Sequence, residues 1–104
     1  MSYLGRLAAV EPSVGVNTLI YTTPPGSSGI SATVSICNRN ATDAVIRLAF
    51  VDGVVADLVA ADWIEYDVTI RAGGMLEKSD IRTTRGQSFV GYSNTANVNF
   101  QIWG

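Results

Sequence analysis

The chain has 104 residues, a formal net charge of −2, no His and one Cys, and 47% of its residues are apolar while 15% are charged. This length fits one domain, the acidic balance argues against a nucleic-acid binder, which is expected to be clearly basic, and the lone Cys37 cannot form an internal disulfide. The charged fraction lies below the ~25% that is typical of soluble domains. Because the cores of protein interfaces are depleted in charge, we expect partner subunits to cover part of the surface; a weakly charged monomer is the alternative.

Residues 1–15 are the least domain-like part of the chain, and we place a single domain at residues 16–104. Tyr3, Leu4 and Leu7 have helical spacing, but the proline that follows ends a segment too short for a stable helix. We expect an extended apolar arm that packs on its own domain or on a neighbouring subunit. The segment lacks the apolar core of a signal peptide, and no apolar run is long enough to span a membrane. We therefore expect a protein made in the cytoplasm that does not bind membranes.

Three segments of the first half have strand patterns. Residues 17–23 are β-branched and aromatic, and residues 30–38 alternate between apolar and small polar side chains. Residues 24–29 between them form a loop, since proline cannot donate to a β-ladder. Residues 43–51 are apolar on both alternating faces, which is typical of a strand that is central or lies under a partner. Residues 54–61 are apolar but too short to predict a helix, so we expect a loop with at most one helical turn.

The second half contains another alternating segment at residues 62–70. A turn follows, then a short strand at residues 75–79 and a loop at residues 80–87. In the alternating segment, the side chains predicted to face inward are Ile64, Tyr66, Val68 and Ile70, and those predicted to face outward are Trp63, Glu65, Asp67 and Thr69.

The last stretch, residues 88–103, is predicted to be a β-hairpin. Apolar residues at 98, 100 and 102 alternate with Asn99, Gln101 and Trp103, and residues 94–97 are of types that tolerate turn geometry. The apolar face belongs to the core. The opposite face offers amides and an indole without charge, which suits pairing with another subunit because amides avoid the desolvation cost of ions.

The whole pattern predicts an all-β fold. Seven to eight short strands are separated by turns at intervals typical of sandwiches and barrels, and helical crossovers are missing, so the sheets should be antiparallel. We predict an antiparallel β-sandwich, with the jelly roll as one arrangement, preceded by the extended N-terminal arm.

Candidate catalytic and metal-binding residues are few. Asp57, Asp62, Glu65 and Asp67 form the one carboxylate cluster, and paired carboxylates can hydrolyse glycosides or bind calcium. Their spacing matches no compact calcium motif, and so small a sandwich leaves little room for a deep cleft, so we favour a solvated face or ion pairs. A nucleophilic Cys37 would need a base such as His. We expect no enzymatic activity, no cofactor and no metal site.

Trp63 and Trp103 are both predicted to face outward. Tryptophan is enriched at the energetic centres of protein interfaces, which favours contacts with other subunits; ordinary packing and stacking on a sugar are the alternatives.

Several motifs spread over nearly the whole chain are similar to those of one group of proteins. They are Leu4-Gly5-Arg6, Asn17-Thr-Leu-Ile-Tyr-Thr22, Ser35-Ile-Cys-Asn-Arg39, Ala44-Val-Ile-Arg-Leu-Ala49, Ile64-Glu-Tyr-Asp67, Gly73-Gly74-Met-Leu-Glu77 and Tyr92-Ser-Asn-Thr-Ala-Asn-Val-Asn-Phe100. In these motifs the chain resembles small virion structural proteins of tailed bacteriophages. The resemblance implies a non-enzymatic, multicopy protein of the virion and carries over no catalytic residue.

We expect from this a homotrimeric capsid decoration (cement) protein whose partners are further copies of itself and the major capsid protein or other virion proteins. A tail, neck or baseplate component is the alternative within this class. A carbohydrate-binding module for receptor recognition, with Trp63, Trp103 and Tyr92 as stacking platforms, is the alternative of another class. The residues expected at interfaces are Tyr3, Leu4, Leu7, Trp63, Asn99, Gln101 and Trp103.

Overall fold

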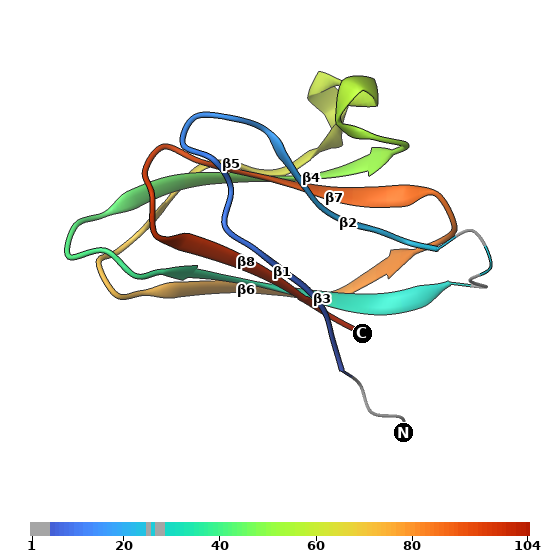
Figure 1. Cartoon of the computed structure of the whole chain (residues 1–104), viewed down its shortest axis with the longest axis horizontal. Helices are drawn as coiled ribbons and strands as arrows, with labels where there is room; N and C mark the ends of the chain where they lie inside the picture. The colour runs from blue at the N-terminus through green and yellow to red at the C-terminus, as the bar shows by residue number, and fades with distance from the viewer. Residues whose placement is uncertain (1–4, 25, 27–28) are drawn as a thin grey trace.

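The structure, a computed structural model, describes residues 5–24, 26 and 29–104. Within this part of the chain, eight strands form two four-stranded antiparallel sheets that pack face to face (Figure 1). The strands are β1 Arg6–Val10, β2 Thr18–Thr22, β3 Ile30–Asn38, β4 Ala44–Asp52, β5 Trp63–Ile70, β6 Met75–Thr83, β7 Gln87–Ser93 and β8 Val98–Trp103, and two 3-10 turns, η1 Val55–Asp57 and η2 Ala60–Asp62, precede β5. No helix among the described residues has the length and apolarity needed to cross a membrane.

The strand order shows how the chain is wrapped. One sheet has the order β1-β8-β3-β6 and the other β2-β7-β4-β5. Strands from the two halves of the chain pair in sequence, β1 with β8, β2 with β7, β3 with β6 and β4 with β5. The chain therefore resembles one long hairpin folded over into two layers, which is the eight-stranded jelly-roll arrangement. The predicted all-β antiparallel sandwich is confirmed.

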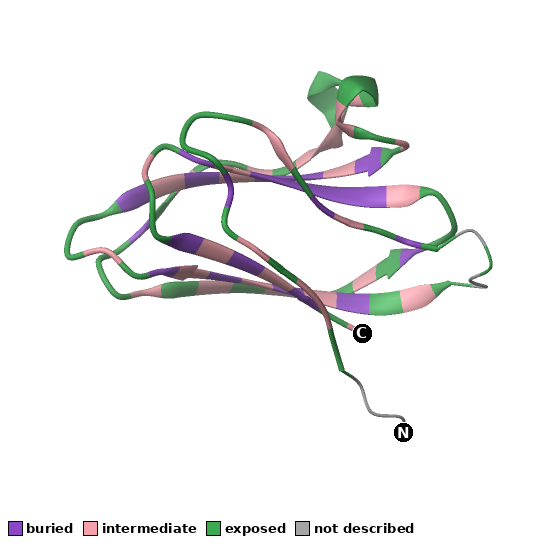
Figure 2. Cartoon of the chain, viewed as in Figure 1, coloured by how far each residue is buried: buried purple, intermediate pink, exposed green. Residues whose placement is uncertain are grey.

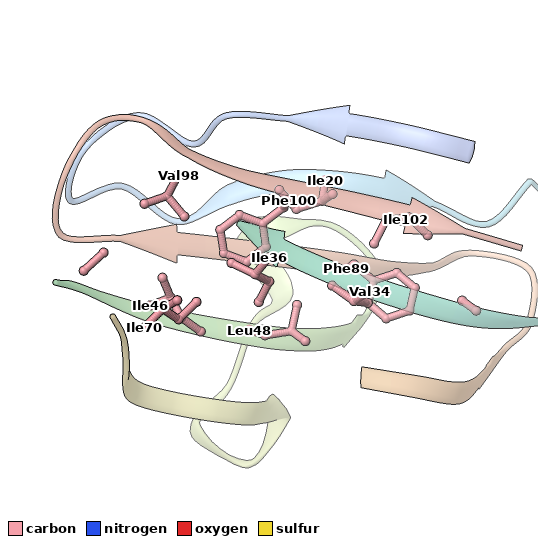
Figure 3. Packing of buried hydrophobic residues seen from close by; sticks show 12 residues of the cluster. Ile20, Val34, Ile36, Ile46, Leu48, Ile70, Phe89, Val98, Phe100 and Ile102 are labelled. Carbon is pink, nitrogen blue, oxygen red and sulfur yellow. The ribbon is translucent and has the colours of Figure 1, made fainter. Parts of the chain in front are cut away.

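The hydrophobic core lies between the two sheets (Figures 2 and 3). The alternation predicted for the last strand is confirmed, since Val98, Phe100 and Ile102 are at most 1% exposed. Phe100 of β8 and Phe89 of β7 enter this core from opposite sheets. Burial of each large apolar side chain stabilises the fold by about 1.5–3 kcal/mol.

The predicted C-terminal hairpin is wrong in its pairing. Both strands exist, but β7 and β8 belong to different sheets, and residues 94–97 carry the chain from one layer to the other (Figure 1). Two consecutive strands with one apolar face each can bury those faces side by side in one sheet or opposite each other across a core. The alternation of side chains is the same in both cases.

The described part of the predicted arm forms an edge strand. Residues 6–10 are β1, which pairs with β8, and Leu7 packs against the core. Gly5 and Gly104 exchange two backbone hydrogen bonds beyond the end of this pair, of 3.2 and 3.0 Å. Residues 6–10 of the arm thus pack on their own domain. The predicted interface residues Tyr3 and Leu4 lie outside the described residues.

Strand β6 is longer than predicted and includes residues 80–83, which were expected to be a loop. Asp80 has a left-handed backbone (φ 59°), and the pairing of β3 with β6 shifts register between Ala32 and Val34. The shift returns Ile81 to the core. A bulge of this kind breaks the strict alternation that marks a strand in sequence.

Candidate functional site

The outer face of the sheet β2-β7-β4-β5 carries a second apolar cluster. Strand β4 alternates as predicted, with Ile46 and Leu48 in the main core. On its other face, Ala49 and Val51 join Val90 of β7 in a separate buried cluster, which we call the outer apolar cluster. The prediction that this strand is central is confirmed, since β4 lies between β7 and β5. Its outer side is covered by the chain's own segment between β4 and β5, which lies on this face (Figure 1).

This covering segment, residues 54–63, repeats a five-residue motif, Val-Val-Ala-Asp-Leu followed by Val-Ala-Ala-Asp-Trp. In each copy the aspartate accepts a hydrogen bond from the backbone N–H of the motif's first valine, over 3.0 Å for Asp57 and 2.9 Å for Asp62. The last residue of each copy, Leu58 or Trp63, then packs on the outer apolar cluster. The segment therefore forms two short 3-10 turns where at most one helical turn was expected.

Next to residues 54–63, three aromatic rings surround the guanidinium group of Arg47. The Arg47 guanidinium carbon lies 4.2 Å from the ring centroid of Tyr66, 4.5 Å from that of Tyr92 and 5.9 Å from that of Trp63. Arg47 Nε also donates a 2.6 Å hydrogen bond to Asp67 Oδ1. We call Arg47, Trp63, Tyr66, Asp67 and Tyr92 the Arg47 cluster.

The Arg47 cluster contains one basic and one acidic side chain, which form an ion pair, so its net charge is close to zero. The hydrogen bond that Arg47 donates to the Asp67 carboxylate raises the pKa of Arg47 above its ordinary value, and the opposite charge of that carboxylate adds to the effect. Cation–π attraction to the three ring faces favours the same position for the guanidinium. Trp63 and Tyr66 also contact each other edge to face, with ring centroids 5.5 Å apart. The cluster is therefore held by several contacts at once.

An irregular strand β5 assembles this cluster. The pairing of β4 with β5 shifts register twice, and Asp67 has a left-handed backbone (φ 53°). As a result, the predicted alternation holds for Trp63 but is wrong for Tyr66, which lies outward, and for Ile64, which is exposed. It is also wrong for Glu65, whose side chain reaches the opposite sheet.

The outer face of the other sheet has a different character. Across the adjacent central strands β3 and β8, the directly opposite residues are Thr33 and Trp103, Ser35 and Gln101, and Cys37 and Asn99. We call these six residues the neutral face, because none of them carries a charge. Charged residues pair with them from the edge strands, Arg6 of β1 beside Trp103 and Glu77 of β6 beside Ser35.

At one end of the neutral face, Arg39 links Asn99 to Glu11 through polar contacts. Arg39 Nε donates a 3.1 Å hydrogen bond to Asn99 Oδ1, and a terminal nitrogen of the same guanidinium lies 2.8 Å from Glu11 Oε1. Gln101 lies beside Arg6, Ala9 and Val10 in a shallow pocket. Asn99 and Gln101 are thus half-buried within one subunit, and their role at an interface stays a prediction.

The structure separates the residues that were considered for sugar stacking. Trp63 and Tyr92 meet in the Arg47 cluster, whereas Trp103 lies on the outer face of the opposite sheet. The three rings therefore do not share one surface, and their use as stacking platforms for a sugar stays a prediction. Tyr66 joins Trp63 and Tyr92 instead of Trp103, and sequence reasoning missed both Tyr66 and Arg47. The available signal was the one charged side chain in the otherwise apolar residues 44–51.

The carboxylate cluster predicted at residues 57–67 is divided among local tasks. Asp57 and Asp62 cap the two turns, Asp67 pairs with Arg47, and Glu65 pairs with Lys78. No group of three or more metal-ligating side chains lies in the part of the chain that the structure describes. Cys37 is a half-buried free thiol on the neutral face.

Comparison of the chain with models of known protein families, with curated proteins and with solved structures gives no match in any of the three. The Arg47 cluster and the neutral face lie on the outer faces of different sheets, on opposite sides of the sandwich.

Proposed function

We propose that this protein is a non-enzymatic structural component of a bacteriophage virion that decorates the capsid as a homotrimer. The observation that carries the proposal is the neutral face, in which two central strands present hydroxyl, thiol, amide and indole groups without charge. Such groups can be buried against another protein surface with their hydrogen bonds satisfied, and they avoid the desolvation cost of ions.

The motifs that resemble virion proteins support the bacteriophage assignment. The jelly roll is also an architecture of viral capsid domains, although a fold alone does not determine a function. A protein of this kind stabilises a shell by burying surface across the junctions between capsid subunits, so that opening the shell must also break the contacts of the decoration protein. Its partners are further copies of itself and the major capsid protein.

The size of the neutral face limits how it can be used. Its two strands, spaced ~4.8 Å apart and about six residues long, present a flat area of roughly 200 Å², about a quarter of the ~800 Å² that each partner buries in a standard interface. Contacts must therefore extend to the edge strands and loops. A threefold ring joins unlike surfaces of neighbouring subunits, so the neutral face would meet a different face of the next copy.

Oligomeric state and capsid binding test the proposal. We expect a trimer in sedimentation velocity, and we expect the protein to bind undecorated phage capsids and raise their melting temperature. Gln101→Glu should weaken trimer formation or capsid binding at least tenfold, because it places a charge in the neutral face. Thr69→Glu, on the exposed face of β5, is the matched control and should not change either.

A stable monomer that neither binds capsids nor raises their melting temperature would overturn the proposal. Copy number per particle, from a stained gel of purified virions, then distinguishes locations within the class. Hundreds of copies indicate the capsid or tail-tube surface, and a handful indicates the neck, baseplate or tail tip.

A further inference from the structure

The Arg47 cluster is open to solvent on the sheet opposite to the neutral face. Tyr66 is 55% exposed and the Asp67 side chain 48%. Beside them, Ala60, Trp63 and Tyr66 line a shallow, open depression. The covering segment of residues 54–63 thus supplies one wall of the depression, and strand β5 supplies the rings.

The groups around the depression are fixed before any ligand binds. Trp63 packs on the outer apolar cluster, and Arg47 is held on central strand β4 by three rings and the Asp67 carboxylate. A preformed site of this kind loses little conformational entropy on binding. Aromatic surface combined with a few placed polar groups is also the usual composition of a small-ligand site.

We propose that the Arg47 cluster and this depression bind a neutral pyranose ring of a glycan. The C–H groups on one face of a pyranose are apolar and pack on aromatic rings, here Trp63 and Tyr66. Sugar hydroxyls both donate and accept hydrogen bonds. Asp67 offers carboxylate lone pairs as acceptors, and Arg47 offers donors, because its one hydrogen bond among the described residues uses Nε and leaves the terminal amino groups.

The charges in the cluster favour a neutral ligand. An anionic ligand would be attracted by Arg47 but repelled by Asp67, which lies 2.6 Å from it, and a cationic ligand would meet the reverse. Proline-rich peptides also bind aromatic grooves, but they bring few donors for the Asp67 carboxylate. A hydroxyl-rich, uncharged ring satisfies both members of the pair.

The two tryptophans provide an internal control for the test, since one lies in the site and the other on the opposite face. The full chain, labelled with ¹⁵N, is titrated with neutral hexasaccharides of glucose, mannose, galactose or N-acetylglucosamine, with a hexagalacturonate and with a decaproline peptide. We expect at least one neutral hexasaccharide to shift the indole N–H resonance of Trp63 saturably and to leave that of Trp103 unchanged. Tyr66→Ala should weaken this binding at least tenfold, whereas Trp103→Ala should not change it.

Three results would overturn the inference. One is a folded protein whose Trp63 resonance does not move with any neutral hexasaccharide at 10 mM. Another is saturation by hexagalacturonate alone, which would make the site anion-selective. The third is saturation by decaproline alone, which would make it a peptide site. These results report glycan binding at Trp63, whereas trimer formation and capsid binding are measured by sedimentation and capsid melting, so the failure of one proposal is distinguishable from the failure of the other.

Discussion

Glu65 of β5 and Lys78 of β6 connect the free edges of the two sheets, with Glu65 Oε2 lying 2.5 Å from Lys78 Nζ. The two side chains differ in burial, since that of Glu65 is 17% exposed and that of Lys78 41%. The pair is therefore intermediate in burial. An ion pair at the surface contributes little to stability, whereas removing one partner of a buried ion pair is strongly destabilising.

We predict that Lys78→Met lowers the free energy of unfolding by about 1–2 kcal/mol, because the partly buried Glu65 carboxylate loses its ion-pair partner. Urea denaturation measures the change. Adding Glu65→Gln should recover part of the loss, since it removes the unpaired charge. Equal stability of the wild type, the single variant and the double variant would show that the pair contributes nothing.

Gly91 of β7 is predicted to be required by the packing of the core. A Cβ at this position would lie 2.9 Å from Phe100 Cε2 and 3.1 Å from Ile20 Cδ1, both in buried side chains. Gly91→Ala should therefore lower the free energy of unfolding by about 1–3 kcal/mol through overpacking. Gly5→Ala is the control, because a Cβ there meets no atom of the described residues within 4 Å, and chemical denaturation should show it to be nearly neutral.

Asn38 is fully buried at the end of β3 and joins three parts of the chain. Its Nδ2 lies 3.0 Å from the carbonyl oxygens of Thr42 and Ile70 and 3.2 Å from that of Arg71, and its Oδ1 accepts a hydrogen bond from the Asn40 backbone. We predict that Asn38→Ala costs about 2–4 kcal/mol, since several polar groups lose their partner at once.

Thermal unfolding checks the Asn38 prediction. Asn99→Ala removes an amide that accepts one hydrogen bond from the described residues, donated by the exposed Arg39 side chain, and should cost less than about 1 kcal/mol. Similar losses for the two variants would contradict the central role of Asn38.

Asp57 and Asp62, which accept hydrogen bonds from backbone N–H groups of residues 54–63, are predicted to hold this segment against the outer apolar cluster. Asp62→Ala removes the acceptor for the Val59 N–H, so the amide of Val59 should exchange with solvent faster and the free energy of unfolding should fall by about 0.5–1 kcal/mol. Hydrogen exchange followed by NMR gives both results. Asp52→Ala, at the exposed end of β4, serves as the control, and unchanged exchange at Val59 in Asp62→Ala would rule out the capping role.

Much of the candidate site could not be predicted from sequence, because irregular pairing between β4 and β5 brings its residues together. Trp63 and Asp67 were placed outward by simple alternation, and the structure agrees. Tyr66, three residues after Trp63, should then have faced inward, but the register shifts in the pairing of β4 with β5 bring it to Arg47. A bulge depends on how two strands fit together, and a single strand's pattern contains no information about its partner.

For most strands, the alternation of apolar and polar residues correctly predicts which side chains face a core. Val98, Phe100 and Ile102 are buried because successive residues of a strand point to opposite faces, and this period is a local property of the chain. The alternation does not predict that β7 and β8 lie in different sheets, that Trp63 and Trp103 face opposite ways, or that Arg47 meets three rings. These relationships depend on pairing between distant segments, and the same alternation is compatible with several pairings.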